Sequence, residues 1–260
     1  MVHVDGTTLT LDQVCAVARA RSSEVALVSA ARARMEESRA LIDRLAAGDA
    51  PIYAVNTGVG LLANRRIPRG DLDQLQRNVI RSHAVGVGEP LSSRAVRAMM
   101  LIRANVLAKG VSGIRPLVAE RLCDLVNRGV TPVVPSQGSV GASGDLAPLA
   151  HMALVLIGEG EAEFEGAVLQ GEAALKRAGL EAIELHPKEG ISLINGTQAM
   201  LAVGCLELEA AETLMESAEV VGAMTLDALR GTPRAFDSRI HEARPHPGQR
   251  ASAERLRALR

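Results

Sequence analysis

The sequence predicts a mainly α-helical protein, a bundle of long helices with one small β-hairpin. Its 260 residues are 47% hydrophobic and 23% charged, so the chain can bury a substantial core. It has only two Phe, one Tyr and no Trp, so this core must be packed with aliphatic side chains, which suit closely spaced helices. Apolar residues also recur at helical spacing along most of the chain. No internal repeat or low-complexity linker divides residues 1–260, and we expect a single domain.

Helix start and stop signals define the elements of the first half. Thr10 and Gln13 have the spacing of a capping box, which predicts a short helix after them. A long helix is expected over residues 23–47, with Gly48 positioned to end it, and another over 71–81. Further helices are expected over 93–109, 116–128, 145–157 and 171–178.

The second half is expected to contain the hairpin and the longest helix. The stretch EAEFEGAVLQ has Glu165 and Gly166 at its middle, which is typical of a β-hairpin. Residues 195–229 contain no proline and repeat apolar positions throughout, which predicts one helix of about 50 Å at roughly 1.5 Å per residue. A helix of this length exceeds one small domain, so we expect lengthwise packing against other helices, including those of other subunits.

Charge and composition exclude several classes of function. The 29 basic and 30 acidic residues give a net charge of −1, so no overall field attracts nucleic acid or anionic lipid. We find no apolar run of the roughly 18 residues that span a bilayer and no leader pattern, and we expect a cytoplasmic protein. Cys15, Cys123 and Cys205 lie far apart in apolar helical patterns, which indicates buried free thiols.

The glycine-rich stretch SQGSVGASGDLAPL, residues 136–149, fits none of the common loop chemistries. A Walker phosphate loop has a lysine after its last glycine, whereas Gly144 is followed by Asp145. The spacing of Gly138, Gly141 and Gly144 does not match the G-x-G-x-x-G dinucleotide pattern, and Asp145 replaces the second glycine of a serine-hydrolase elbow. Because apolar segments enter and leave the loop, we expect it to be buried.

The Ala142-Ser143-Gly144 tripeptide within this loop allows a different chemistry. Without a Cβ beside it, the Gly144 nitrogen can approach the carbonyl carbon of Ala142 in a sharply bent backbone. Attack closes a five-membered ring, and loss of two waters, one carrying the Ser143 hydroxyl, leaves an exocyclic methylidene. This group is an electrophile that no ordinary side chain supplies. Asp145 could shuttle protons for the two dehydrations.

The run GSVGASGDLAPLAH is similar to the signature of the histidine and aromatic amino-acid ammonia-lyases, which make methylidene-imidazolone from Ala-Ser-Gly. The same resemblance extends over the whole chain in four further stretches. It implies a mostly α-helical bundle that forms a homotetramer, with each active site drawn from three subunits. It also implies a prosthetic ring formed autocatalytically, with no metal and no dissociable cofactor. The four stretches are YAVNTGVG at 53–60, SHAVGVGEP at 82–90, INGTQAM at 194–200 and AFDSRIHEARPHPGQ at 235–249.

The resemblance assigns roles to four residues outside the tripeptide. Tyr53 matches the family's catalytic base, although a lone tyrosine can also serve only a turn or the core. A tyrosine phenol needs nearby positive charge or hydrogen-bond donors to ionise near neutral pH. Asn195 matches a residue that orients the substrate, or it could be only a helix N-cap. Gly60 is expected at the substrate-binding site, and so is His83.

His83 bears on the identity of the substrate. A histidine after serine, as in Ser82-His83, is similar to the histidine-specific members, in which one imidazole can hydrogen-bond the other. Some tyrosine lyases and aminomutases also have a histidine here, and a loop-packing role is the alternative. The spacing of His241 and His246 matches no common metal site, so we expect structural roles for both. His151 is expected to lie in the core or behind the site.

The chain looks like the N-terminal half of such an enzyme. Family members are considerably longer, and their later half carries the arginine that holds the substrate carboxylate. We therefore expect a truncated or proteolysed fragment, and two classes of function remain. The first is non-oxidative deamination of L-histidine to urocanate and ammonia, with tyrosine or phenylalanine lyases and aminomutases as relatives of the same chemistry. The second is a non-catalytic helical module.

Overall fold

The structure, a computed structural model, describes residues 1–20 and 24–259. It is mainly α-helical with a few short strands, as the sequence predicts. The chain forms two compact units, Met1–Cys205 and Leu206–Arg260, and each is described by itself. The expectation of a single domain over residues 1–260 stays a prediction.

The first unit contains most of the helices and all the strands of the described chain. Its strands are β1 (Val2–Val4), β2 (Val25–Leu27), β3 (Val87–Pro90), β4 (Thr131–Pro132), β5 (Pro135–Gln137), β6 (Glu161–Phe164) and β7 (Ala167–Gln170). Its helices are α1 (Leu11–Arg19), α2 (Ser29–Ala47), α3 (Leu72–His83), α4 (Ser93–Leu107), α5 (Pro116–Arg128), α6 (Leu146–Leu156), α7 (Gly171–Arg177), α8 (Glu189–Ile194) and the start of α9 (Gln198–Ala228), with 3-10 turns at Gly60–Leu62 and Arg69–Asp71.

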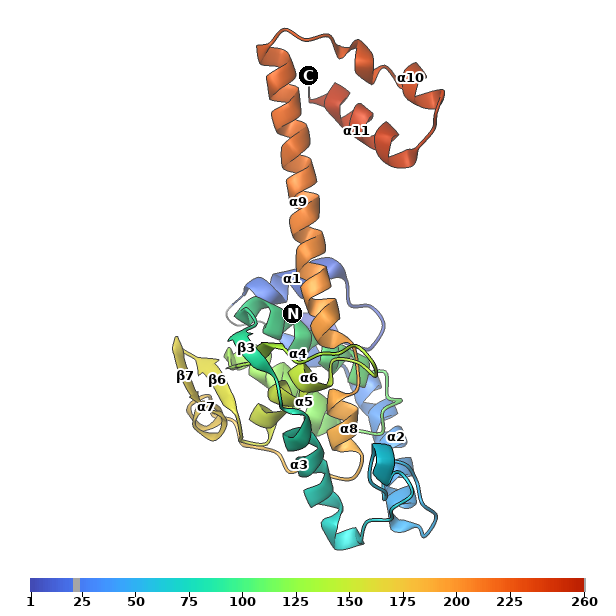
Figure 1. The fold of residues 1–260 in the computed structure, drawn as a ribbon, viewed down its shortest axis with the longest axis vertical. Coiled ribbons are helices and arrows are strands. Elements are labelled where there is room, and N and C mark those ends of the chain that lie inside the picture. The colour runs from blue at the N-terminus through green and yellow to red at the C-terminus, as the bar shows by residue number, and fades with distance from the viewer. Residues whose placement is uncertain (21–23, 260) are drawn as a thin grey trace. The chain divides into compact units, whose positions relative to one another are not determined.

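Helix α4 forms the centre of this unit. It packs against α1 and α5, while α6 packs against α3 and α8 (Figure 1). Four consecutive residues, Ala98 to Leu101, are completely buried, so α4 is covered on every side. Two arginines of the same helix, Arg97 and Arg103, are buried as well. Arginines rarely occur in a core unless they are hydrogen-bonded, and both of these donate to backbone carbonyls.

Several local signals in the sequence are confirmed. Thr10 caps α1 with both bonds of the capping box, from Gln13 N to Thr10 Oγ1 at 3.3 Å and from Thr10 N to Gln13 Oε1 at 3.1 Å. Helix α5 begins at a proline and ends at Gly129, whose φ of 74° is left-handed. In the hairpin β6–β7, Glu165 and Gly166 have φ of 51° and 80°, the conformation of a tight two-residue turn.

The helix expected over residues 23–47 is shorter than predicted. Residue 23 lies outside the described residues, and α2 begins only at Ser29. Residues Val25–Leu27 instead form strand β2, which pairs in parallel with β1. The side chain of Asn127 accepts from Val25 N and donates to Val25 O, both at 2.8 Å. These long-range bonds take the backbone groups that a helix would use, which the local apolar pattern could not reveal.

The long helix expected over residues 195–229 is confirmed as α9, which begins three residues later than predicted. Helix α8 ends at Ile194 and α9 begins at Gln198. The side chain of Arg103 donates to the carbonyl oxygens of Ser192 and Asn195, which supplies partners for carbonyls at the end of α8. We call residues 195–198 the glycine turn, because Gly196 lies at its centre.

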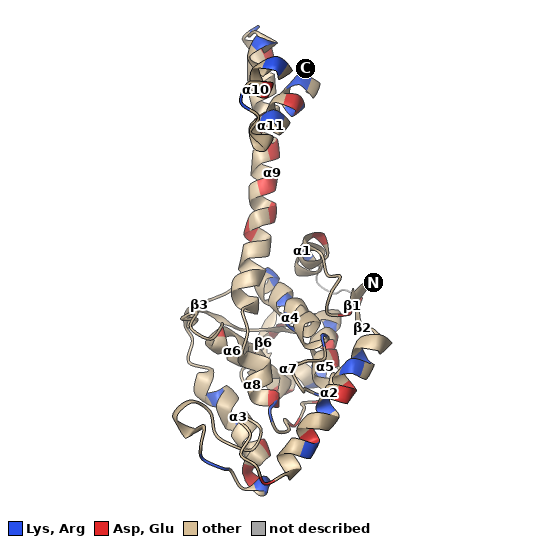
Figure 2. Cartoon of the chain, turned by 90° about the vertical axis from the view of Figure 1, so that its right-hand side faces the viewer, with Lys and Arg blue, Asp and Glu red and all other residues tan. Residues whose placement is uncertain are grey.

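One helical stretch corrects the expectation that no segment is long and apolar enough to cross a membrane. Residues Glu189–Ala228 meet that criterion by length and composition. Core helices of soluble proteins meet it as well, and this stretch begins at the fully buried carboxylate Glu189. Figure 2 marks acidic residues, in red, at intervals along α9. Length and composition alone therefore do not identify this stretch as a membrane span.

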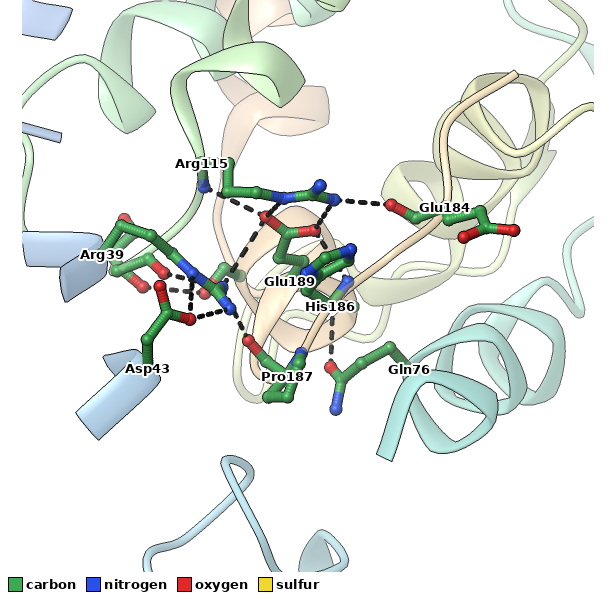
Figure 3. Close-up of polar contacts among 12 residues, drawn as sticks. Arg39, Asp43, Gln76, Arg115, Glu184, His186, Pro187 and Glu189 are labelled. Carbon is green, nitrogen blue, oxygen red and sulfur yellow. Dashed lines mark hydrogen bonds and ion pairs between the residues drawn. The ribbon is translucent and has the colours of Figure 1, made fainter. Parts of the chain in front are cut away.

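The carboxylate of Glu189 joins four parts of the first unit (Figure 3). Its two oxygens accept from Arg115 Nε at 2.8 Å and Arg115 Nη2 at 2.6 Å, and from the backbone nitrogens of Arg115 and His186. Arg39 of α2 lies 3.7 Å from the same carboxylate and donates to Pro187 O at 3.0 Å. Burial disfavours the charge on Arg115, but the hydrogen bonds and negative charge of Glu189 outweigh it and raise the pKa of Arg115.

A neighbouring contact joins α8 to α3. The backbone nitrogen of Gly190 donates to Oε1 of the buried Gln76 at 3.0 Å. A Cβ on Gly190 would lie only 2.7 Å from the Gln76 carbonyl oxygen, so only glycine fits here. Together, Glu189 and Gly190 fix the start of α8 against α2, α3 and the start of α5.

The second unit is built from the later part of α9, a 3-10 turn (Pro233–Phe236), α10 (Ser238–Glu242) and α11 (Pro247–Ala258). Ser252 donates to Glu219 Oε1 at 2.6 Å, and Arg255 forms an ion pair with the same carboxylate at 3.1 Å, so α11 is held to α9 within this unit. His241 is buried between Ala235 O at 3.1 Å and Gln249 Nε2 at 3.0 Å, which is the structural role expected for it.

Replacing Glu189 tests the buried ion cluster. Glu189→Gln keeps the shape but leaves the partly buried Arg115 without its carboxylate partner, while Arg39 keeps Asp43 at 2.6 Å, so we expect the free energy of unfolding to fall by about 3–5 kcal/mol. The matched control is Glu165→Gln, whose ion pair with Arg177 at 2.6 Å is exposed. That change should cost less than about 1 kcal/mol. Urea unfolding of the two variants measures both, and equal losses would contradict a dominant role for Glu189.

Candidate functional site

Two of the four further motif stretches, 82–90 and 194–200, contact the glycine-rich loop or the elements beside it. Strand β3, which follows His83, pairs antiparallel with β5, which leads into the loop. The backbone nitrogen of Gly86 donates to His151 Nε2 at 3.0 Å, which joins the same segment to α6 on the far side of the loop. His151 thus has the supporting role that the sequence suggests, and burial lowers its pKa.

The tip of the loop is exposed in this chain, which corrects the expectation of a buried loop. Residues 136–143, including Ala142 and Ser143, are exposed, whereas Gly144 and Asp145 are buried and Asp145 retains only 2% of its accessible surface. The apolar segments on either side are buried, with Val134 and Leu149 at 0% exposure. The apolar patterns belong to the flanks of the loop and not to its tip. Only the flanks could be predicted as buried from these patterns.

Asp145 fixes the C-terminal end of the loop. Its backbone nitrogen donates to Gly196 O at 2.6 Å, and its Oδ2 accepts from Met200 N at 2.8 Å. Its other oxygen, Oδ1, accepts from Ser139 Oγ at 2.7 Å. The buried carboxylate therefore bridges both ends of the loop to the start of α9. It also stands as the N-cap residue of α6, where negative charge is favourable, but makes no side-chain cap bond.

Gly144 is held directly against Gly196. Its φ of 113° lies in the region that side chains rarely adopt. A Cβ on Gly144 would overlap the backbone oxygen, carbon and nitrogen of Gly196. Gly196 is equally confined, because a Cβ there would overlap Arg103 Nη1 and Gln198 Oε1. Two glycine backbones are thus in contact, which is possible only without side chains on either.

Arg103 holds the other side of the glycine turn. Besides Ser192 O, it donates to Asn195 O at 3.1 Å and to Gln198 Oε1 at 2.7 Å. It retains 2% exposure, and burial lowers its pKa to about 10, so it stays cationic at neutral pH. Its Nε has no hydrogen-bond partner among the described residues.

Tyr53 and Asn195 line one pocket of about 270 Å³. Arg103 and Lys188 line it too, so two basic residues are near the tyrosine. Burial lowers the pKa of Lys188. The phenol oxygen of Tyr53 accepts from Gly60 N at 3.4 Å, a long contact, and the tyrosine is 56% exposed. The phenol therefore lies in a pocket with two basic side chains and one backbone donor.

The loop that carries Tyr53 is shaped by its own polar side chains. Asn56 accepts from Ile52 N at 2.7 Å and donates to Ala50 O at 2.9 Å, and the fully buried Thr57 contacts the same loop. Ala54 has a φ of 57°, which is unfavourable for a residue with a Cβ by about 1–2 kcal/mol. Strained backbone maintained by surrounding bonds is a common feature of functional sites.

His83 is the last residue of α3 and bonds to its own helix. Its Nδ1 lies 2.7 Å from Val79 O and 3.2 Å from Ser82 Oγ. Because a carbonyl oxygen only accepts, Nδ1 carries the proton and the Nε2 lone pair is left as an acceptor. No described contact joins His83 to Tyr53 or Asn195.

The remaining predicted residues have structural surroundings. Asn195 ends α8, with its nitrogen bonded to Ile191 O at 3.0 Å, so the alternative that it is a helix N-cap is wrong. Among the described residues, Cys15, Cys123 and Cys205 form no disulfide; Cys15 and Cys123 are buried as expected, whereas Cys205 is only half-buried, and burial raises the pKa of Cys123 to about 12. In residues 1–20 and 24–259 no group of three or more His, Cys, Asp or Glu could hold a metal ion.

Sequence reasoning missed Arg103, Gln198, Asn56 and Thr57. The last three lie inside motifs that were recognised, and their polar character among apolar residues was the available signal. The sequence signal for Arg103 was weaker, because a single arginine in the apolar stretch MMLIRANVL is compatible with an exposed helix face. Only the packing of α4 shows that this position is buried.

The sequence family described as aromatic amino acid lyase matches residues 9–260. A histidine ammonia-lyase of Koribacter versatilis is 58% identical over 258 residues, covering 99% of this chain and 50% of that protein. The crystal structure of histidine ammonia-lyase from Trypanosoma cruzi has a TM-score of 0.93 at 39% identity, over 99% of this chain and 50% of the other. Tyrosine aminomutase from Streptomyces globisporus gives 0.93 at 40%, over 99% and 48%. The chain spans about half the length of the curated relatives it matches.

Substituting alanine for two loop glycines tests the contact with Gly196. Gly144→Ala places a Cβ on the Gly196 backbone, so we expect the free energy of unfolding to fall by several kcal/mol and the loop to become more sensitive to protease. The control, Gly141→Ala, has a positive φ of 68° but nothing within 4 Å of its Cβ. It should cost only about 1–2 kcal/mol of backbone strain. Similar effects of the two changes would show that the Gly144–Gly196 contact is unimportant.

Proposed function

Because the chain belongs to the aromatic amino acid lyase family, we propose that the whole protein deaminates L-histidine to urocanate and ammonia. The observation that carries this proposal is the contact between the Ala142-Ser143-Gly144 loop and the glycine turn, through Asp145 N and Gly196 O at 2.6 Å. This contact joins two segments 50 residues apart and bends the backbone at the residue whose nitrogen must attack.

The tripeptide is proposed to form the prosthetic ring without a further reactant. Gly144 N bonds to the Ala142 carbonyl carbon, and its proton passes to the carbonyl oxygen. That oxygen leaves as water with the Ser143 amide proton, and the Ser143 hydroxyl leaves with the Ser143 α-proton. The ring supplies an electrophile that makes the substrate amine a better leaving group. The residues fit such a ring, since Gly144 has the positive φ and the absence of a Cβ that a tight bend requires.

The remaining roles are assigned to the chain's own polar groups. Tyr53 is proposed as the base that removes the β-proton, supported by Gly60 N–H at its oxygen and by Arg103 and Lys188 in the same pocket. Asn195, which lines that pocket, is proposed to orient the substrate. Asp145 is proposed to assist the dehydrations, since its carboxylate is buried beside the tripeptide.

Histidine is the proposed substrate for two reasons. The acceptor Nε2 of His83 suits the N–H of a substrate imidazole. The relatives with the highest identities among those compared, from 47% to 58%, are named histidine ammonia-lyases. A tyrosine aminomutase is the second candidate, because one solved structure of that kind is 40% identical to this chain.

We further propose a cytoplasmic homo-oligomer, a tetramer by analogy with the family, with no nucleic-acid or membrane partner. In support, the second unit exposes large apolar side chains along α9 that another helix could cover. They include Leu208, Leu214, Met215, Val221 and Met224.

The mass of one peptide tests ring formation in the natural full-length protein. A peptide that contains residues 142–144 should lack two waters, and Ser143→Ala should restore its unmodified mass. Tyr53→Phe should leave the water loss unchanged but lower kcat by roughly 10²–10⁴-fold, since it removes only the base. An unmodified wild-type peptide would refute the lyase and favour a non-catalytic helical module.

Substrate choice is tested by His83→Phe in the same full-length protein. Losing the hydrogen bond to a buried substrate group should cost about 1–3 kcal/mol, or roughly 10- to 100-fold in kcat/KM for histidine. Parallel assays with histidine, tyrosine and phenylalanine follow ammonia and the unsaturated acid, and thermal unfolding serves as the control. Faster wild-type turnover of tyrosine or phenylalanine would exclude a histidine lyase. Equal losses of activity and stability would indicate a packing role for His83.

A further inference from the structure

We propose that Arg103 is the positioning residue for ring formation, acting through the glycine turn to hold Gly144 in its bent conformation. The inference rests on the proposed function, because it concerns how the same loop is prepared for cyclisation. Arg103 touches neither Ser143 nor Asp145 in any described contact, so its effect passes through Gly196.

The first step is the hold of Arg103 on the turn. Its guanidinium donates to Ser192 O, Asn195 O and Gln198 Oε1, which lie before and after Gly196 in the chain. These three acceptors span both ends of the turn, so one rigid side chain fixes its whole width. The planar fork of arginine reaches several acceptors in fixed directions, which the single ammonium of lysine does not.

The second step is the transmission from the turn to the loop. Gly196 O accepts from Asp145 N at 2.6 Å, which fixes the peptide plane between Gly144 and Asp145. Met200, just after the turn, binds the Asp145 carboxylate at 2.8 Å. The Gly144 backbone cannot move toward the turn, because Gly196 already fills the space where a Cβ would lie. Displacing the turn therefore removes two bonds and a steric stop from the residue that must cyclise.

The third step asks why a cation is buried at position 103. Arg103 takes part in no ion pair among the described residues, and its Nε is buried without a partner. An apolar residue would fill such a position without the desolvation penalty. The charge on this side chain strengthens its bonds to the carbonyls of the turn, as charge-assisted hydrogen bonds do.

Arg97 provides a matched control on the same helix. It has 4% exposure against 2% for Arg103, and it also donates to backbone carbonyls, those of Val17 at 3.2 Å and Val126 at 3.3 Å. Its Nη2 is likewise buried without a partner. Arg97 contacts the ends of α1 and α5 and has no described contact with the glycine turn. A purely structural role for buried arginines would therefore make the two positions equivalent.

The experiment compares Arg103→Lys and Arg97→Lys in the natural full-length protein. The fraction of the 142–144 peptide that lacks two waters is measured at fixed times after synthesis. Arg103→Lys is expected to slow ring formation by roughly 10²-fold, the effect of a misplacement of about 1 Å at a reacting centre. Arg97→Lys should form the ring at the wild-type rate, although both variants lose stability. A wild-type rate in Arg103→Lys, or equal slowing in both, would overturn the proposal.

Hydrogen exchange at the amides of Asp145 and Met200 gives a second measurement that does not need the ring. Both amides should exchange faster in Arg103→Lys and remain protected in Arg97→Lys. If the wild-type protein forms no ring, the proposed function fails, while this comparison still decides whether Arg103 holds the loop. Unchanged protection in Arg103→Lys would show that Arg103 does not act on the loop.

Discussion

The buried carboxylate of Glu189 is the contact on which the rest of the first unit depends. It is fully removed from water. It accepts hydrogen bonds from the Arg115 side chain and from His186 N, and it lies 3.7 Å from the guanidinium of Arg39. A buried carboxylate without these partners would be strongly unfavourable, so the segments that supply them must come together when the chain folds. The start of α8 is thereby fixed against α2, α3 and α5. The position of the glycine turn, which directly follows α8, depends on this start.

A second buried ion continues the same arrangement at the other end of α8. Arg103 binds the last carbonyls of this short helix, and Glu189 is its first residue. Helix α8 therefore begins at a buried anion, and its last carbonyl groups bind a buried cation. Neither end of this short helix can move without breaking these contacts. The turn that follows presents Gly196 to Gly144 without the variation expected of an exposed loop. The loop tip, residues 136–143, is exposed, whereas Gly144 and Asp145 at its base are buried against this turn.

Sequence reasoning succeeded where the determining interactions are local. The capping box of α1, the proline and glycine at the ends of α5 and the turn of the β6–β7 hairpin each depend on a few adjacent residues. It failed where a distant side chain decided the backbone. Asn127 bonds both backbone groups of Val25 in strand β2, where the sequence predicted the start of a helix. The loop was expected to be buried because its flanks are apolar, and only the flanks were found buried.

The sequence by itself determined the helical class and the family, because periodicity, spacing and residue type are all written along the chain, and the chemistry proposed for the tripeptide rests on the same motifs. It also identified Tyr53, His83 and Asn195 as candidates, since they lie in recognisable motifs. Only the tertiary structure decided that Asp145 and Gly144 meet the glycine turn and that Arg103 lies buried behind it. The physical reason is that these contacts join residues that are 51 (Asp145 and Gly196) to 95 (Arg103 and Gln198) positions apart. Which distant backbone groups are brought together is decided by packing and by the burial of a few charges, and neither can be read from local sequence.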